Sequence, residues 1–371
     1  MIPFNKPYLT GKELIYIEDA VKKGKISGNG YYTQLCHDFF ERNYGFHKCL
    51  LTTSCTDALE MAALLIDIKE GDEVIMPSYT FVSTANAFVL RGATIIFADS
   101  RKDHPGIDED RIEALITSKT KAIVPVHYAG VACDMDKIMA LATKYNLYVI
   151  EDAAQAIDSF YTGKDGVKRA LGSIGHLAAF SFHETKNIIS GEGGMLAIND
   201  TRFSERAEVI WEKGTNRSAF FRGEVNKYGW VDVGSSFLPS EIIAAFLWAQ
   251  LENIKDIQQV RKSHWDHYNS KLQNWAFEND IQLPILPSFA TNNGHMYYIV
   301  CKTMEQRQSI IEKLKSKEIL SVFHYISLHG SSFYKKSSFG LDLSESDRYS
   351  DCLLRLPMFY ELNVQEIINA L

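Results

Sequence analysis

The chain has 371 residues, of which 46% are hydrophobic and 23% are charged. Lysine and arginine total 39 and aspartate and glutamate total 46, so the formal net charge is −7. This composition predicts a folded protein and excludes extended disorder. The acidic balance argues against a protein that binds nucleic acid or an anionic membrane over a broad basic surface. The length suggests a large domain accompanied by a smaller one.

The six cysteines are scattered, with no C-x-x-C pair and no histidine close enough to complete a zinc pattern. This distribution predicts free thiols in a reducing compartment and no bound metal. The first residues lack the basic-then-apolar layout of a signal peptide. No run of about 18 apolar residues is present, so no membrane span is expected. We therefore expect a cytoplasmic protein.

The first two thirds of the chain alternate between helical and strand patterns. One-sided apolar spacing predicts a helix over 11–25, and short apolar runs then alternate with helical stretches between residues 48 and 150. Runs such as 122–126 and 148–150 are apolar on both faces, which is typical of strands buried in a parallel sheet. Two further strands are predicted at 178–182 and 195–198. These patterns predict β-α-β units and an α/β fold with a mostly parallel sheet.

The last third of the chain has a different pattern. A long helix is predicted from Ser240, a candidate N-cap, through Ile254. Strands follow at 297–301 and 322–325, with helices at 306–317 and 364–371. We therefore predict a large domain at 1–255 and a small α+β C-terminal domain at 256–371.

Three polar segments follow predicted strands, at the edge where open α/β sheets bind their ligands. The turn 53–58 opens a helix whose N-terminal N–H groups suit a phosphate. Asp152 follows a buried strand, where a carboxylate needs a cation or a donor. Lys186 precedes a glycine-rich turn, and burial there would lower its pKa and favour imine chemistry. Each segment alone also fits a helix cap or a solvated lysine, but together they are the parts needed to hold pyridoxal phosphate (PLP).

Six motifs make this interpretation more specific. They are GDEVIMPSYTF at 71–81, PVHYAG at 125–130, EDAAQ at 151–155, FSFHETKN at 180–187, FHYISLH at 323–329 and LP at 356–357. In this order they resemble the DegT/StrS family of PLP-dependent sugar aminotransferases, over nearly the whole chain. The resemblance implies fold type I of the PLP-dependent transferases, the aspartate aminotransferase class. The opening MIPFN, SCT at 54–56 and KGTNR at 213–217 look most similar to transaminases of TDP-4-oxo-6-deoxyglucose.

The resemblance also implies roles for single residues. Lys186 would hold the cofactor covalently and move a proton, Asp152 would pair with the ring nitrogen, and His183 would line the site. Ser236 stands where many members carry an asparagine that reaches the partner subunit's phosphate, and the arginine that follows in their pattern is missing here. The remaining implied cofactor contacts are Gln155, Phe81, Cys55, Thr56, Ser54 and Ser181.

The implied reaction has two halves. L-glutamate donates its amine to PLP, giving pyridoxamine phosphate, which then aminates the keto group of a TDP-linked sugar. The favoured product is TDP-4-amino-4,6-dideoxy-D-galactose for a surface polysaccharide of the O-antigen or enterobacterial common antigen type; the gluco epimer and amination at C3 remain open. The resemblance further implies a homodimer with shared active sites. Candidate substrate contacts are Arg217, Arg222 and Lys227 for the diphosphate, and Asn29, Tyr325 and His329 for the sugar.

Two rival functions fit the sequence less well than transamination. Pyridoxamine-dependent dehydratases on the same fold carry histidine in place of the lysine, so Lys186 favours transamination. A PLP-binding regulatory protein would carry an appended DNA-binding domain, for which this chain has neither spare length nor a basic stretch.

Overall fold

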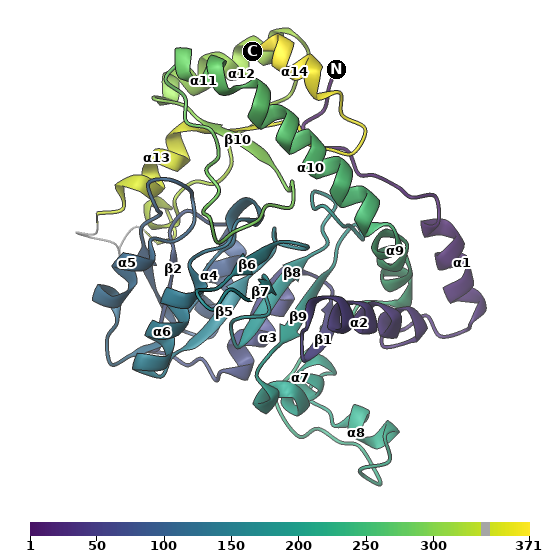
Figure 1. The fold of residues 1–371 in the computed structure, drawn as a ribbon. Coiled ribbons are helices and arrows are strands. Elements are labelled where there is room, and N and C mark those ends of the chain that lie inside the picture. The colour runs from purple at the N-terminus through teal and green to yellow at the C-terminus, as the bar shows by residue number, and fades with distance from the viewer. Residues whose placement is uncertain (335–341) are drawn as a thin grey trace.

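The computed structural model describes residues 1–334 and 342–371. Its centre is a seven-stranded sheet in the order β1-β9-β8-β5-β4-β2-β3 (Figure 1). Neighbouring strands from β3 through β8 run parallel, whereas β9 is antiparallel to both β8 and β1. This confirms the mostly parallel sheet. The strands are β1 (Lys48–Thr52), β2 (Glu73–Pro77), β3 (Thr94–Ala98), β4 (Thr120–Ile123), β5 (Tyr148–Asp152), β8 (Leu177–Ser181) and β9 (Gly194–Ile198).

Helices cover both faces of the sheet because its strands are apolar on both sides. α2, α6 and α9 contribute to one hydrophobic core, and α3, α4 and α7 contribute to the other. A small hairpin of β6 (Phe160–Thr162) and β7 (Lys168–Ala170) follows β5. The helices are α1 (Glu13–Lys22), α2 (Tyr31–Tyr44), α3 (Cys55–Leu65), α4 (Val82–Val89), α5 (Glu109–Ile112), α6 (Met135–Tyr145), α7 (Ser204–Trp211), α8 (Arg217–Phe221) and α9 (Glu241–Glu252).

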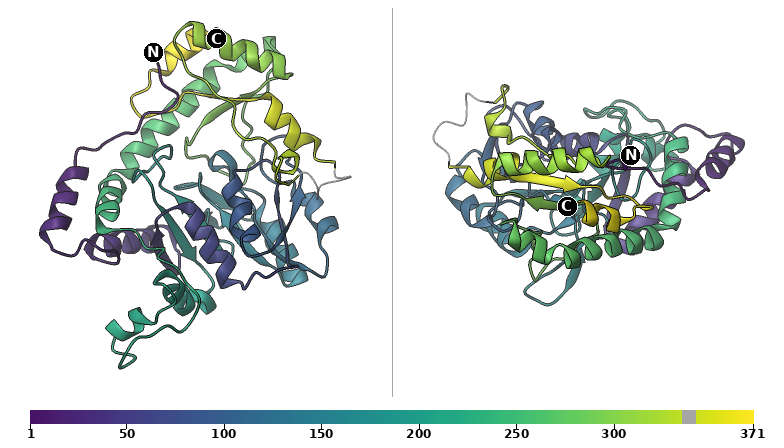
Figure 2. Two further views of the ribbon diagram at one scale, coloured as in Figure 1. Left: turned by 180° about the vertical axis from the view of Figure 1, so that it is seen from behind. Right: turned by 90° about the horizontal axis from the view of Figure 1, so that it is seen from above.

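The C-terminal part of the chain forms a second layer with its own core (Figures 1 and 2). Strands β10 (Tyr297–Val300) and β11 (Leu353–Leu356) pair antiparallel. The N-terminus joins this layer, because the Ile2 N–H donates to the Glu318 carbonyl at 2.7 Å. The helices of the layer are α10 (Ile254–Lys271), α11 (Gln273–Glu278), α12 (Met304–Ser316), α13 (Ser344–Cys352) and α14 (Val364–Ala370). The division at residue 255 remains a prediction.

Two predicted elements differ from the structure. The segment 322–325 is not a strand: Val322 makes a single bridge to Arg355, and the side chains of His324 and Tyr325 then bond to the other layer. The helix from Ser240 ends at Glu252, because Asn253 leaves the helical conformation and α10 begins after it.

Neither a membrane-crossing helix nor a metal cluster is found in the described part of the chain. No helix there is long and apolar enough to span a bilayer. No group of three His, Cys, Asp or Glu side chains is placed to hold a metal ion.

Candidate active site

A cavity of about 1060 Å³ lies where the sheet meets the C-terminal layer. One wall comes from residues at the ends of β1, β2, β5 and β8, and the other from residues 295–296, 322–325 and 355–358. It therefore occupies the edge of the sheet where ligands were expected. The predicted residues that line it are Ser54, Cys55, Thr56, Phe81, Asp152, Gln155, Ser181, His183, Lys186 and Tyr325.

Lys186 enters this cavity from the turn that follows β8. Among the described residues, no carboxylate or hydrogen-bond acceptor pairs with its ammonium group. Burial lowers the pKa of Lys186, while the nearby Cys55 and Asp152 oppose that shift. The lowered pKa increases the neutral fraction of the amine, which is the form that attacks a carbonyl or accepts a proton.

Asp152 ends β5 as a buried carboxylate facing the same cavity. The Thr84 hydroxyl donates to its Oδ2 at 2.7 Å, and the Ala154 N–H donates to its Oδ1 at 3.1 Å. Burial raises the pKa of Asp152, and these two hydrogen bonds partly lower it again. No cation forms an ion pair with it within the described chain. A protonated ring nitrogen would supply the missing positive partner.

The turn between β1 and α3 provides an anion site. Ser54 caps α3 by accepting from the Asp57 N–H at 3.1 Å. The N–H groups of Cys55 and Thr56 stand in the first turn, where a helix has no internal acceptor for them. Gly194 brings β9 against this turn, since a Cβ there would lie 2.4 Å from the Cys55 nitrogen. Gly194 also pairs with Ser181 in the sheet, and Ser181 lines the same cavity as the turn.

Aromatic and polar groups complete the cavity. Phe81 is 54% exposed although it lies in the cavity wall, so a flat apolar ring can stack on it. Gln155 accepts from the Ala129 N–H at 2.6 Å and donates to the Tyr325 hydroxyl at 2.9 Å, which links the two walls. His183 lies at the rim, with Nδ1 2.9 Å from the Thr185 hydroxyl. An unpaired lysine, an unpaired buried carboxylate, an exposed aromatic and a helix N-terminus together fit PLP.

The other predicted contacts do not line this cavity. Arg222 pairs with Glu208 at 2.7 Å and with Glu224 at 2.8 Å, and Arg217 lies 3.8 Å from Glu212. These two arginines belong to α8, which extends away from the sheet (Figure 1).

Four more predicted contacts also lie elsewhere. Ser236 is exposed, and its backbone forms an isolated β-bridge with Glu212. The Asn29 side-chain amide donates to the carboxylate of the same Glu212 at 3.4 Å. His329 contacts the Ser78 hydroxyl at 2.7 Å. Lys227 follows α8 as an exposed side chain. The roles of these residues remain predictions for a site shared between subunits.

Glu151, beside Asp152, has a role that the sequence analysis did not assign. Its buried carboxylate accepts from the N–H groups of Gly172 and Ile174, both at 2.8 Å, and meets His127 Nε2 at 2.8 Å. The Cys133 N–H donates to His127 Nδ1, so Nε2 carries the hydrogen. This network fixes the end of β5 and with it the position of Asp152. A glutamate inside an apolar strand was the available signal.

Arg355 is a second residue that the sequence analysis missed. It lines the cavity from β11, in the run Leu353-Leu354-Arg355-Leu356. A single charge within an apolar strand would have indicated it.

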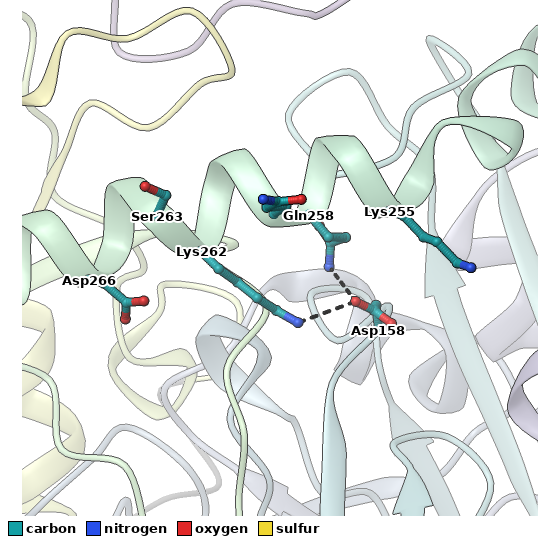
Figure 3. A pocket seen from close by; sticks show the side chains of 7 residues that line it. Asp158, Lys255, Gln258, Lys262, Ser263 and Asp266 are labelled. Carbon is teal, nitrogen blue, oxygen red and sulfur yellow. Dashed lines mark hydrogen bonds and ion pairs between the residues drawn. The ribbon is translucent and has the colours of Figure 1, made fainter.

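Another pocket lies along α10 and contains none of the predicted residues (Figure 3). There Asp158 accepts from Lys262 and from Gln258, both at 3.4 Å. The pocket is lined by polar and charged side chains and has no aromatic wall, so it does not fit PLP.

Known proteins resemble the chain over its whole length. The DegT/DnrJ/EryC1/StrS aminotransferase family matches residues 7–371. SpsC of Bacillus subtilis strain 168, a spore coat polysaccharide biosynthesis protein, is 32% identical over 387 residues, covering 100% of this chain and 96% of SpsC.

Solved structures of aminotransferases also resemble the chain. The PLP form of Spr1654 from Streptococcus pneumoniae superposes with a TM-score of 0.87 at 26% identity, covering 99% of this chain and 97% of that one. DesV from S. venezuelae superposes with a TM-score of 0.89 at 26% identity, covering 100% and 97%. The chain thus belongs to the DegT/DnrJ/EryC1/StrS aminotransferase family and is a PLP-dependent sugar aminotransferase.

Proposed function

We propose that this enzyme moves the amine of L-glutamate to C4 of TDP-4-oxo-6-deoxy-D-glucose, producing TDP-4-amino-4,6-dideoxy-D-galactose in the cytoplasm. Amine transfer rests on one observation above all, the unpaired Lys186 and the unpaired Asp152 in one cavity. The choice of sugar rests on the motifs MIPFN, SCT and KGTNR. SpsC acts in polysaccharide biosynthesis, which supports an O-antigen or related surface polysaccharide as the destination.

The residues of the cavity have different roles in this reaction. Bound PLP supplies an electron sink that makes the α-proton of the donor acidic. Lys186 Nζ accepts that proton, and in the second half it delivers a proton to the sugar carbon that receives the amine. Asp152 holds the positive charge of the ring nitrogen. The turn at Ser54 and the Ser181 hydroxyl bind the phosphate, away from the reacting atoms.

The cavity has room for a nucleotide sugar as well as the cofactor. Its volume of about 1060 Å³ lies just above the roughly 300–1,000 Å³ that is usual for small-molecule sites. The wall formed by residues 322–325 contributes polar and aromatic groups to the cavity that Lys186 also lines. A sugar presents hydroxyls and a carbon face, which such a wall can bind.

A homodimer is part of the proposal. Large apolar side chains are exposed on the α8 arm, residues 213–230, with Trp230 at 84% and Phe221 at 69% exposure. Leu14 of α1 is 78% exposed. A second copy would cover such side chains, and it would let Ser236 and the basic arm reach the neighbouring cavity. Sedimentation velocity should give a dimer; a fully active monomer would contradict this part of the proposal.

One product analysis tests the proposed reaction. The purified enzyme is incubated with PLP, L-glutamate and TDP-4-oxo-6-deoxy-D-glucose, and the product is examined by NMR. A galacto product has an axial amine at C4 and therefore a small coupling between H3 and H4. A large coupling would instead identify the gluco epimer, and an amine at C3 after reaction with a 3-oxo sugar would identify a C3 enzyme. Absence of any amino sugar would overturn the proposal.

A further inference from the structure

Arg355 occupies an unusual position for a charged residue. It stands inside β11 with its backbone paired to Tyr298 and Val322, and it lines the cavity that holds Lys186. Its Nη2 donates to the Phe323 carbonyl at 3.2 Å, and the guanidinium lies 4.6 Å from the centre of the Phe4 ring. These contacts fix the guanidinium in the cavity wall.

No acid compensates this charge in the described part of the chain. Arg355 forms no ion pair there, and its Nε is buried without an acceptor. Burial lowers the pKa of Arg355, which is the expected sign of a desolvated cation. Arg355 itself is half-buried. By contrast, Arg261 is fully buried without an acid, but it donates to two backbone carbonyls and lies outside the cavity. A partly buried charge without an acidic partner is costly, and a ligand anion would offset that cost.

The neighbouring histidines do not supply a competing positive charge. His295 and His324 line the same wall. Burial lowers the pKa of both well below the usual value, and the charges of Arg355 and Lys186 add to the effect. Both rings therefore stay neutral near pH 7, so Arg355 is the cation that this wall presents.

We propose that Arg355 binds the α-carboxylate of the amino-acid donor; this inference rests on the proposed function, since it assumes such a donor. The planar guanidinium presents parallel N–H groups that match the two oxygens of a carboxylate. Within the described residues, the guanidinium makes one hydrogen bond, from Nη2 to the Phe323 carbonyl, so Nη1 is left without a protein acceptor. The arginine would hold the donor with its α-carbon toward Lys186.

Because Arg355 and Lys186 line the same cavity, a carboxylate is favoured over the diphosphate of the nucleotide sugar. In an α-amino acid, the carboxylate is bonded to the carbon that carries the amine, so its partner must lie near Lys186. Arg355 is close enough that its charge contributes to lowering the pKa of Lys186, in addition to the larger effect of burial. In the sugar substrate, the diphosphate is attached to C1, across the ring from C4. A cation for the diphosphate is therefore expected further from the lysine.

The test compares Arg355→Gln and Arg355→Lys with Arg307→Gln in the PLP-loaded enzyme. Arg307 is a matched control, because it lies 5.8 Å from the Phe323 ring and also has an unpartnered Nε, yet does not line the cavity. Loss of a charged hydrogen bond should reduce kcat/KM for L-glutamate by about 10- to 100-fold in Arg355→Gln. KM for the keto sugar should change less than about twofold, and Arg355→Lys should recover part of the loss.

A binding measurement accompanies the kinetics. 2-Methylglutarate carries the carboxylates of glutamate with a methyl group in place of the amine, and calorimetry measures its affinity for the holoenzyme. Arg355→Gln should weaken this affinity to a similar degree, and Arg307→Gln should not. If Arg355→Gln does not fold, the comparison of Arg355→Lys with wild type gives the same test.

The outcomes separate this inference from the proposed function. Unchanged glutamate kinetics and unchanged 2-methylglutarate binding in the Arg355 variants would overturn the inference alone. A rise in KM for the keto sugar without an effect on glutamate would also overturn it, because Arg355 would then serve the diphosphate. If wild type accepts another α-amino acid instead of glutamate, the donor in the proposed function is wrong and Arg355 is tested with that amino acid. If wild type accepts no amino acid, both fail.

Discussion

The cavity and the α8 arm both carry arginines, but the two regions differ in whether an acidic side chain neutralises them. In the cavity, Lys186 and Arg355 have no acidic partner among the described residues. On the arm, Arg222 is held by Glu208 and Glu224. A charge without a partner in a partly buried wall lowers the stability of the fold, and it is retained where a ligand neutralises it. Exposed ion pairs, by contrast, contribute little to stability. The comparison predicts large functional effects in the cavity and small ones on the arm.

Removal of the cavity lysine should give the largest effect. Lys186→Ala removes both the covalent link to the cofactor and the base, so turnover should fall by at least about 10⁴-fold. The assay measures 2-oxoglutarate formed over many turnovers. Borohydride reduction followed by peptide mass spectrometry should find PLP on Lys186 in wild type only. Lys255→Ala, in the polar pocket on α10, is the control and should keep wild-type activity. Appreciable turnover by Lys186→Ala would contradict the assignment.

Glu151, whose buried carboxylate has hydrogen-bond partners, should affect the free energy of unfolding instead of the reaction. Glu151→Gln replaces one carboxylate oxygen by an amide that cannot accept from the backbone N–H groups around it. Breaking such a buried network should cost about 3–5 kcal/mol of unfolding free energy. Denaturant titration of both proteins measures the change, with the exposed Glu305→Gln as control. A change that does not exceed the control would mean that another group satisfies these donors.

Substitution of Thr84 tests whether its hydrogen bond controls the pKa of Asp152. Its hydroxyl hydrogen bond lowers the pKa of a carboxyl that burial raises. In Thr84→Val the pKa of Asp152 should rise further, so the ionised form is lost at a higher pH. The acidic limb of kcat/KM should therefore move up by about 1–2 pH units. Thr84→Ser keeps the hydroxyl and should keep the wild-type profile; a limb that stays in place in Thr84→Val would show that Asp152 does not govern it.

Ten of the predicted site residues line one cavity, because the motifs that carry them stand at strand ends. Lys186, Asp152 and the turn at Ser54 each follow an apolar run, and a parallel sheet brings the ends of such runs to one edge. The same reasoning missed Arg355, since β11 is short and contributes from the opposite layer. The lone charge in an apolar run marks Arg355 as unusual, but its place in this cavity depends on how the two layers face each other, which no local pattern encodes.

The misplaced elements have a similar cause. Residues 322–325 alternate like a strand, yet Tyr325 bonds to Gln155 and His324 to Tyr128, so long-range contacts decide their conformation. α2 was not predicted, although its buried face carries Tyr32, Cys36 and Phe40. Polar residues interrupt the apolar spacing of that helix, so the spacing alone does not predict it. Packing against α9 and β1 stabilises the helical conformation.

The arm should give the smallest effect, and hybrid dimers can show which cavity it serves. Arg222→Gln should raise KM for the nucleotide sugar by at most about 5-fold, because the arginine is already paired with glutamates and exposed. The half reaction with glutamate should not change. In a hybrid of Arg222→Gln with Lys186→Ala, only the subunit that lacks Arg222 has a working lysine.

If the arm reaches across the dimer, that working cavity receives the intact Arg222 of the other subunit. Its KM should then equal the wild-type value, although only one cavity of the hybrid is active. If the arm serves its own subunit, the KM of the hybrid should equal that of the Arg222→Gln homodimer. An unchanged KM in the homodimer itself would show that the compensated charge of Arg222 does not bind the nucleotide sugar.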